Sequence, residues 1–238
     1  MTKVPHMGRT GGIETMAALI ISIFGLFIVA GIMNQPRDVS YNASTGPYVW
    51  ALFSALCVLG ASATLLPHLC GHSDHKSQGL DKSRTSTLLG IRIVHGHHHL
   101  CEGFREHEFS IGDKTFCVGC IGLLIGASMA FVIATLYFLF GFVYPSPVAF
   151  IGMACVAIGL LAVPLPRAGA SPLWIAFNAA LVVGFALILS AVDQVNGLKL
   201  DLFIIGMCIF WMFTRIQLSR WNHTRICRSC GCRIECVR

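Results

Sequence analysis

The sequence predicts an all-α, polytopic integral membrane protein with about six transmembrane helices, a small Cys/His-rich cytoplasmic loop and a Cys-rich tail. Of the 238 residues, 55% are hydrophobic and 12% are charged, and the mean hydropathy is +0.72. Soluble domains contain about 25% charged residues, so this composition is typical of a chain in a bilayer. The apolar residues gather in six runs, at 15–33, 48–66, 120–142, 148–163, 173–191 and 200–216.

The basic residues predict the orientation of these runs, because Lys and Arg are enriched in cytoplasmic loops. With six spans and the N-terminus inside, 15 of the 17 basic residues fall on the inner side and 2 on the outer side. The sequence therefore predicts a multi-pass protein of the cell membrane with both termini cytoplasmic. Runs 148–163 and 200–216 are short, since a helix needs about 20 residues to cross a bilayer. The distribution of basic residues supports both runs as spans, because without either one the basic residues would no longer gather on one side of the membrane.

We interpret residues 1–238 as a single membrane domain with an inserted cytoplasmic loop, 67–119, and a cytoplasmic, Cys-rich basic tail, 217–238. The loop has few large apolar side chains, and small domains of this kind commonly need a metal or disulfides to fold. Asp193 and Asp201 bound a brief outer loop between the last two spans.

Histidines and cysteines are densest in the second half of the inserted loop. Cys117-x-x-Cys120 places two thiols close enough to bind one metal ion. Between Cys101 and this motif, the short runs on either side of Gly112-Asp113 predict a small hairpin, which would bring Cys101 back toward Cys117. A Cys₃His zinc site follows, with His97, His98 or His99 as its fourth ligand. The alternative is a reduced, unliganded loop with solvated histidines.

The tail offers four more thiols. With Cys70, Cys101, Cys117 and Cys120 of the loop, they make eight cysteines on the predicted inner side. The cytoplasm keeps thiols reduced, so these cysteines are available to bind a metal ion. Neighbouring arginines would stabilise their thiolates. Four thiolates suit zinc, which we prefer to an iron–sulfur cluster because the usual iron–sulfur spacings are not matched. Tail and loop could hold two sites or share one mixed site. The tail ligands would be Cys227, Cys230, Cys232 and Cys236.

A resemblance to a known family rests on the same region. Cys101, Phe109, Gly112, Cys117-x-x-Cys120-x-Gly122 and Gly126 resemble the signature of an uncharacterised family of polytopic membrane proteins, domain of unknown function 2085. The resemblance implies the same architecture and a Cys/His site, but no reaction. The chain departs from the signature at three positions, with Glu102 in place of His, Glu108 in place of Ser and Gly119 in place of the Arg between the cysteines.

The third span contains Gly122-x-x-x-Gly126-x-x-x-Ala130. Small residues four positions apart line one helix face and let another helix approach closely. We therefore expect this face to pack against another helix. The expected partners are the lipid bilayer and other membrane-protein subunits, bound through transmembrane helices that include the Gly122/Gly126/Ala130 face, and no nucleic acid.

The function that we infer is that of a non-catalytic membrane subunit or scaffold with structural zinc binding. The sequence contains no nucleophile elbow, phosphate loop or HExxH motif. Ion-coupled carriers place ionisable side chains at membrane depth, and the interiors of these apolar runs contain none, so a transporter is disfavoured. The alternative is a membrane enzyme or metal-handling protein that uses the 97–120 loop as a working metal site.

Overall fold

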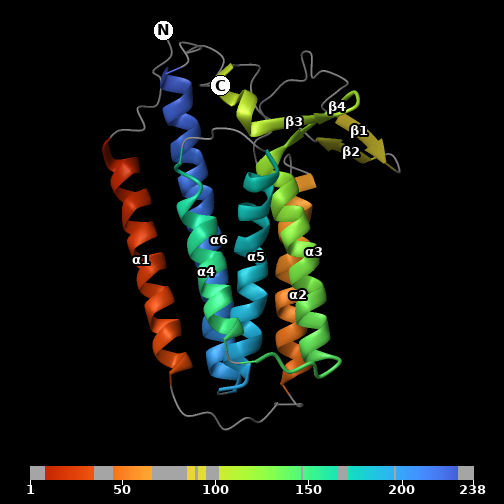
Figure 1. The fold of residues 1–238 in the computed structure, drawn as a ribbon, viewed down its shortest axis with the longest axis vertical. Coiled ribbons are helices and arrows are strands. Elements are labelled where there is room, and N and C mark those ends of the chain that lie inside the picture. The colour runs from red at the N-terminus through yellow and green to blue at the C-terminus, as the bar shows by residue number, and fades with distance from the viewer. Residues whose placement is uncertain are drawn as a thin grey trace.

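The computed structural model describes residues 9–34, 45–65, 85–88, 91–94, 102–145, 147–165, 171–195 and 197–229. Within these ranges, six α-helices run side by side in one bundle (Figure 1). Five of them are long and apolar enough to cross a membrane, which indicates a multi-pass membrane protein. The helices are α1 (Arg9–Met33), α2 (Gly46–Leu65), α3 (Val118–Phe138), α4 (Val148–Leu161), α5 (Ser171–Asp193) and α6 (Leu198–Ser229).

The predicted fold class is confirmed at this coarse level, with two differences in detail. Each predicted apolar run corresponds to one helix, but the run 120–142 extends four residues beyond α3, and α4 has only 14 residues. Helix α6 has 32 residues and continues to Ser229, so the first part of the predicted tail is helical. At 1.5 Å per residue, α6 is about 48 Å long and exceeds the roughly 30 Å hydrocarbon core of a bilayer.

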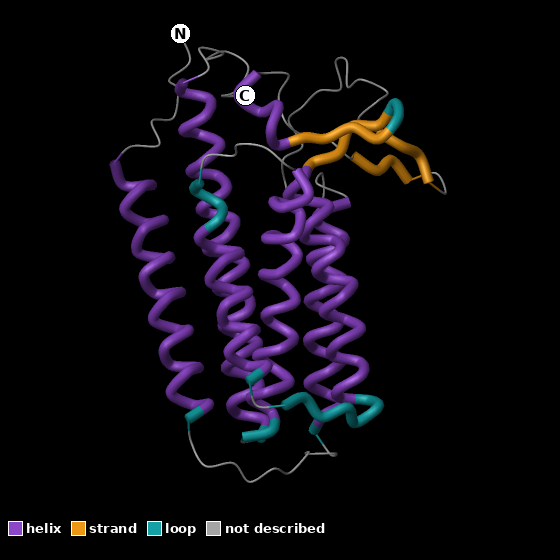
Figure 2. Tube along the Cα trace, viewed as in Figure 1, coloured by secondary structure: helices purple, strands orange, loops and turns teal. Residues whose placement is uncertain are grey.

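Short strands gather at one end of the bundle, as Figure 2 shows. β1 (Thr85–Leu88) pairs antiparallel with β2 (Ile91–Val94), and β3 (Glu108–Ile111) pairs antiparallel with β4 (Lys114–Cys117). A 3₁₀ helix, η3 (Glu102–His107), leads into β3. The β3–β4 hairpin is the one that the sequence predicts, and it lies at the bundle end where α1 begins and α6 ends (Figure 1).

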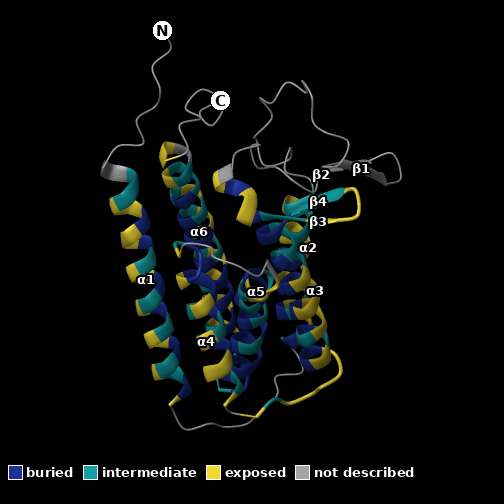
Figure 3. Ribbon diagram, turned by 45° about the horizontal axis from the view of Figure 1, so that its top comes forward, coloured by how far each residue is buried: buried dark blue, intermediate teal, exposed yellow. Residues whose placement is uncertain are grey.

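Helix α5 forms the centre of the bundle. It packs against α3, α4 and α6, and most of its surface is buried (Figure 3). Leu181, Ile188 and Leu189 of α5 are fully enclosed, and Phe185 stacks on Trp211 of α6 with ring centroids 5.9 Å apart. By contrast, α1 contacts mainly α6 and α4 and exposes several large apolar side chains, which suits a helix whose outer face meets lipid.

The small-residue face of α3 packs against α5. A Cβ atom on Gly126 would lie 2.7 Å from the carbonyl oxygen of Ala179, and one on Gly122 would lie 2.6 Å from that of Ile175. Only glycine permits such backbone contact. The face therefore packs against a helix, and that helix is α5 of the same chain. That other subunits bind, through this face or another, stays a prediction.

Candidate functional site

The β3–β4 hairpin delivers Cys117 to the start of α3. Gly112 adopts a left-handed φ of 57° at the turn, a conformation that glycine reaches without strain. In the resulting register Glu108 lies opposite Cys117, and Phe109 stacks on Phe116. Cys117 is the residue that precedes the first turn of α3, and Cys120 lies within that turn, so their thiols hydrogen-bond to each other. The structure thus brings together the two thiols of the Cys-x-x-Cys motif.

A buried arginine from α6 lies beside these thiols. Arg215 is only 9% exposed, and its charge interacts with the thiols of Cys117 and Cys120. A Cβ atom on Gly119, between the two cysteines, would lie 3.1 Å from Arg215 Nη2. The same Nη2 donates a hydrogen bond to Asn178 Oδ1 over 2.5 Å, and Asn178 Nδ2 donates to the carbonyl oxygen of Trp174 over 2.6 Å.

Arg215 is a residue that sequence reasoning missed, because we place it near the end of the last span. The extension of α6 by several turns puts it inside the bundle instead. A guanidinium is costly to bury unless an anion or strong acceptors offset the cost. Its Nε has no hydrogen-bond partner in the described part of the chain. The arrangement therefore places a buried guanidinium next to two thiols.

The other predicted metal ligands cannot be placed beside this pair. Cys101, His97, His99, Cys230, Cys232 and Cys236 lie outside the described residues, and only the backbone of Cys227, in the last turn of α6, is described. Among the residues that the structure describes, no three His, Cys, Asp or Glu side chains form a group suited to a metal ion. Metal binding stays a prediction.

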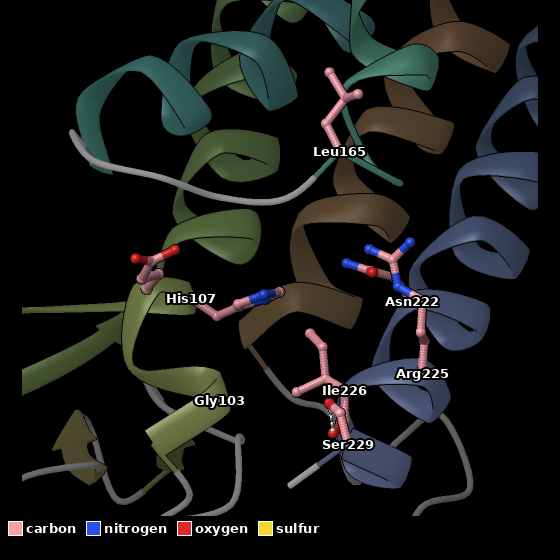
Figure 4. Close-up of a pocket in the computed structure, with 8 residues that line it drawn as sticks. Gly103, His107, Leu165, Asn222, Arg225, Ile226 and Ser229 are labelled. Carbon is pink, nitrogen blue, oxygen red and sulfur yellow. Dashed lines mark hydrogen bonds between the residues drawn. The ribbon is translucent and has the colours of Figure 1, made fainter.

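A polar pocket lies between η3 and the end of α6. It has a volume of about 240 Å³. Figure 4 shows His107 on η3 pointing toward α6, with Asn222 and Arg225 on the facing side. His107 is 4% exposed, and its ring meets those of Phe104 and His223 edge to face. The pocket is lined by Gly103, Glu106 and His107, by Leu165 after α4, and by Asn222, Arg225, Ile226 and Ser229 of α6.

At the opposite end of the bundle, three polar side chains from three helices meet in the core. Tyr137 of α3 donates a hydrogen bond to Asp193 Oδ2 of α5 over 2.7 Å. The carboxyl group of Asp201, from the first turn of α6, lies close enough to Asp193 for the two groups to interact. Asp193 is 2% exposed and Asp201 is fully buried.

Three ionisable side chains at or near the ends of the predicted spans, those of Asp193, Asp201 and Arg215, are buried in the bundle, which the sequence does not indicate. The two aspartates flank the turn between α5 and α6. Two carboxyl groups this close do not both stay ionised unless a cation lies between them.

Comparison with family models, with curated proteins and with solved structures found no match to this chain.

Proposed function

We propose that the chain is a non-catalytic membrane subunit or scaffold whose Cys117–Cys120 pair holds a structural zinc ion together with cysteines of the loop or the tail. The observation that carries the proposal is the contact between the two thiols at the hairpin–α3 junction, beside the buried guanidinium of Arg215. Zinc would tie the hairpin to the bundle.

The guanidinium of Arg215 opposes in part the hydrogen bond between the two thiols and their burial, both of which favour the neutral thiol of Cys120. Zinc binds the deprotonated thiolate, and a neighbouring cation stabilises that form. Arg215 supplies such a cation from α6, and the charges that act on its guanidinium are those of Cys117 and Cys120. In the family that the chain resembles, an Arg stands between the two cysteines. Here that position is Gly119, and a guanidinium reaches the same place from another helix.

The packing of η3 favours a contribution from the tail. Phe104 and His107 of η3 contact His223 of α6, and Gly103 and Ser229 line the same pocket. In the sequence, Cys101 lies two residues before Gly103, and Cys230 directly follows Ser229. A mixed site with Cys101 and tail cysteines is therefore the version that we prefer. Arg215 lies 14 residues before Ser229, about 21 Å along α6, so the tail would have to fold back to reach Cys117.

The scaffold role follows from what such a site does. Four-ligand zinc sites are usually closed and structural, and zinc binding can supply roughly 10 kcal/mol or more to the folding of a small segment. The hairpin exposes Ile111 and its turn. A hairpin held rigid by zinc would present this edge to a partner subunit.

The test is the zinc content of protein purified from cells, measured by elemental analysis for the wild type and for matched Cys→Ser variants. We expect Cys117→Ser and Cys120→Ser to lose bound zinc. The control is Cys155→Ser, a single thiol in α4 that is half-buried and far along the chain from the hairpin. We expect it to retain the wild-type zinc content.

Two outcomes would overturn the proposal. Wild-type protein with less than about half an equivalent of any transition metal would exclude the site. Zinc that exchanges rapidly with a chelator while the protein stays folded would instead favour the alternative, a metal-handling protein or metalloenzyme, because structural sites release metal slowly and lose their fold with it.

A further inference from the structure

The pocket between η3 and α6 combines one cationic group, one anionic group and one buried acceptor. Arg225 donates from Nη2 to the carbonyl oxygen of Pro164 over 3.2 Å, and its guanidinium lies over the ring of Trp221, 5.4 Å from the centroid. These two contacts fix the guanidinium but use only one of its five N–H donors. The remaining donors are available to an anion.

Asn222 supplies the acceptor. Its side chain is 3% exposed, and Nδ2 donates to the carbonyl oxygen of Val163 over 3.3 Å. Its Oδ1 is buried and has no hydrogen-bond partner among the described residues. A buried amide oxygen without a donor costs free energy, so this atom indicates a ligand that carries N–H or O–H groups. Glu106, an exposed residue of η3, also lines the pocket.

The position of the pocket along α6 indicates which part of the membrane lies beside it and can supply the ligand. Asn222 lies 24 residues after Leu198, which is about 36 Å along the helix. This distance exceeds the roughly 30 Å hydrocarbon core, so the pocket lies at the height of the lipid headgroups. Trp221, next to it in the sequence, is of the type enriched at that interface.

From these observations we propose that the pocket binds an ethanolamine phosphate group, the headgroup of a phosphatidylethanolamine. The phosphate accepts hydrogen bonds from Arg225, and the ammonium donates to Asn222 Oδ1 and Glu106. A purely anionic ligand would meet the carboxylate of Glu106, and a purely cationic one would meet Arg225. A choline headgroup has no N–H donor for Asn222. The volume of about 240 Å³ has room for a group of several non-hydrogen atoms.

The experiment is native mass spectrometry of the purified full chain in detergent, titrated separately with phosphatidylethanolamine and phosphatidylcholine. We expect the wild type to bind the ethanolamine lipid about tenfold more tightly. Arg225→Gln should weaken binding of both lipids about tenfold, because both carry the phosphate. Glu106→Gln should remove the preference for ethanolamine and leave phosphatidylcholine binding unchanged. Both side chains are exposed, so neither variant is expected to disturb folding.

The matched control is Arg220→Gln, which removes the same charge from an exposed position of α6 outside the pocket lining. Equal affinities of the wild type for the two lipids, or equal effects of Arg225→Gln and Arg220→Gln, would overturn the proposal. A competition experiment with free O-phosphoethanolamine tests whether the ethanolamine phosphate group belongs to a lipid or to a soluble ligand. Displacement of the lipid by this compound at comparable concentration assigns the pocket to a soluble ligand, and failure to displace assigns it to the lipid.

Discussion

Replacement of Gly126 by Ala tests the packing on which the placement of the candidate site depends. The added methyl group would lie 2.7 Å from the carbonyl oxygen of Ala179 and 2.8 Å from its Cα. Both atoms belong to the backbone of α5 and cannot rotate away, so α3 and α5 must move apart. Because both contacts are with backbone atoms, the cost should lie in the upper part of the range for overpacking, about 2–3 kcal/mol, and the better helix propensity of Ala recovers about 1 kcal/mol. We expect a net loss of about 1–2 kcal/mol.

The matched control is Gly206→Ala in α6, where a Cβ atom would meet nothing within 4 Å. There the helix propensity acts alone, and we expect a gain of about 0.5–1 kcal/mol. Thermal unfolding of the purified protein in one detergent measures both. A loss of 1–2 kcal/mol lowers Tm by roughly 2–8 °C for a chain of this size. Equal Tm values for the two variants, or a higher Tm for Gly126→Ala than for the wild type, would refute the close approach of α3 and α5.

Three further predictions concern the polar groups and the orientation. Tyr137→Phe removes the hydrogen bond to Asp193 and should lower the free energy of unfolding by about 1–2 kcal/mol. The control Tyr48→Phe changes a side chain that is 75% exposed and should leave Tm unchanged. Equal effects of the two variants on Tm would contradict the buried hydrogen bond between Tyr137 and Asp193. Arg215→Gln should lower the zinc content of the purified protein, and Arg220→Gln should not; retained zinc in Arg215→Gln would show that the guanidinium does not support the thiolates. In intact cells, an impermeant thiol reagent should label a cysteine placed at Thr45 and not one at Ser229, and labelling of Ser229→Cys would reverse the orientation.

The bundle and the hairpin could be predicted because both depend on local patterns. Apolar runs of about 20 residues identify membrane helices, and Gly112-Asp113 between two short alternating runs identifies the turn. The close contact of α3 with α5 also follows from a local pattern, the four-residue spacing of Gly122, Gly126 and Ala130. The partner helix does not, because nothing in that spacing distinguishes α5 from any other span.

The buried polar groups could not be predicted, because their burial depends on where helices end and how they rotate. Asp193 and Asp201 flank a turn, where charged residues are usually solvated. Helix α5 ends two residues after the predicted run and α6 begins two residues before it, and both carboxyl groups lie near Tyr137. Arg215 is the second-last residue of the predicted run 200–216, so the sequence places it at the cytoplasmic end of the span. Its burial beside Cys117 follows from the continuation of α6 past the predicted span, which the polar residues after Arg215 do not indicate.

The central proposal is that cysteine thiolates bind zinc. The zinc K-edge X-ray absorption spectrum of the purified wild-type protein measures the zinc–sulfur bond directly. We expect a shell of sulfur atoms at about 2.3 Å from zinc, the distance of a zinc–thiolate bond. In the Cys117→Ser variant this shell should lose intensity or disappear with the metal. A first shell of only nitrogen and oxygen atoms at about 2.0–2.2 Å would contradict the account, because the metal would then be held by groups other than the cysteines at the start of α3.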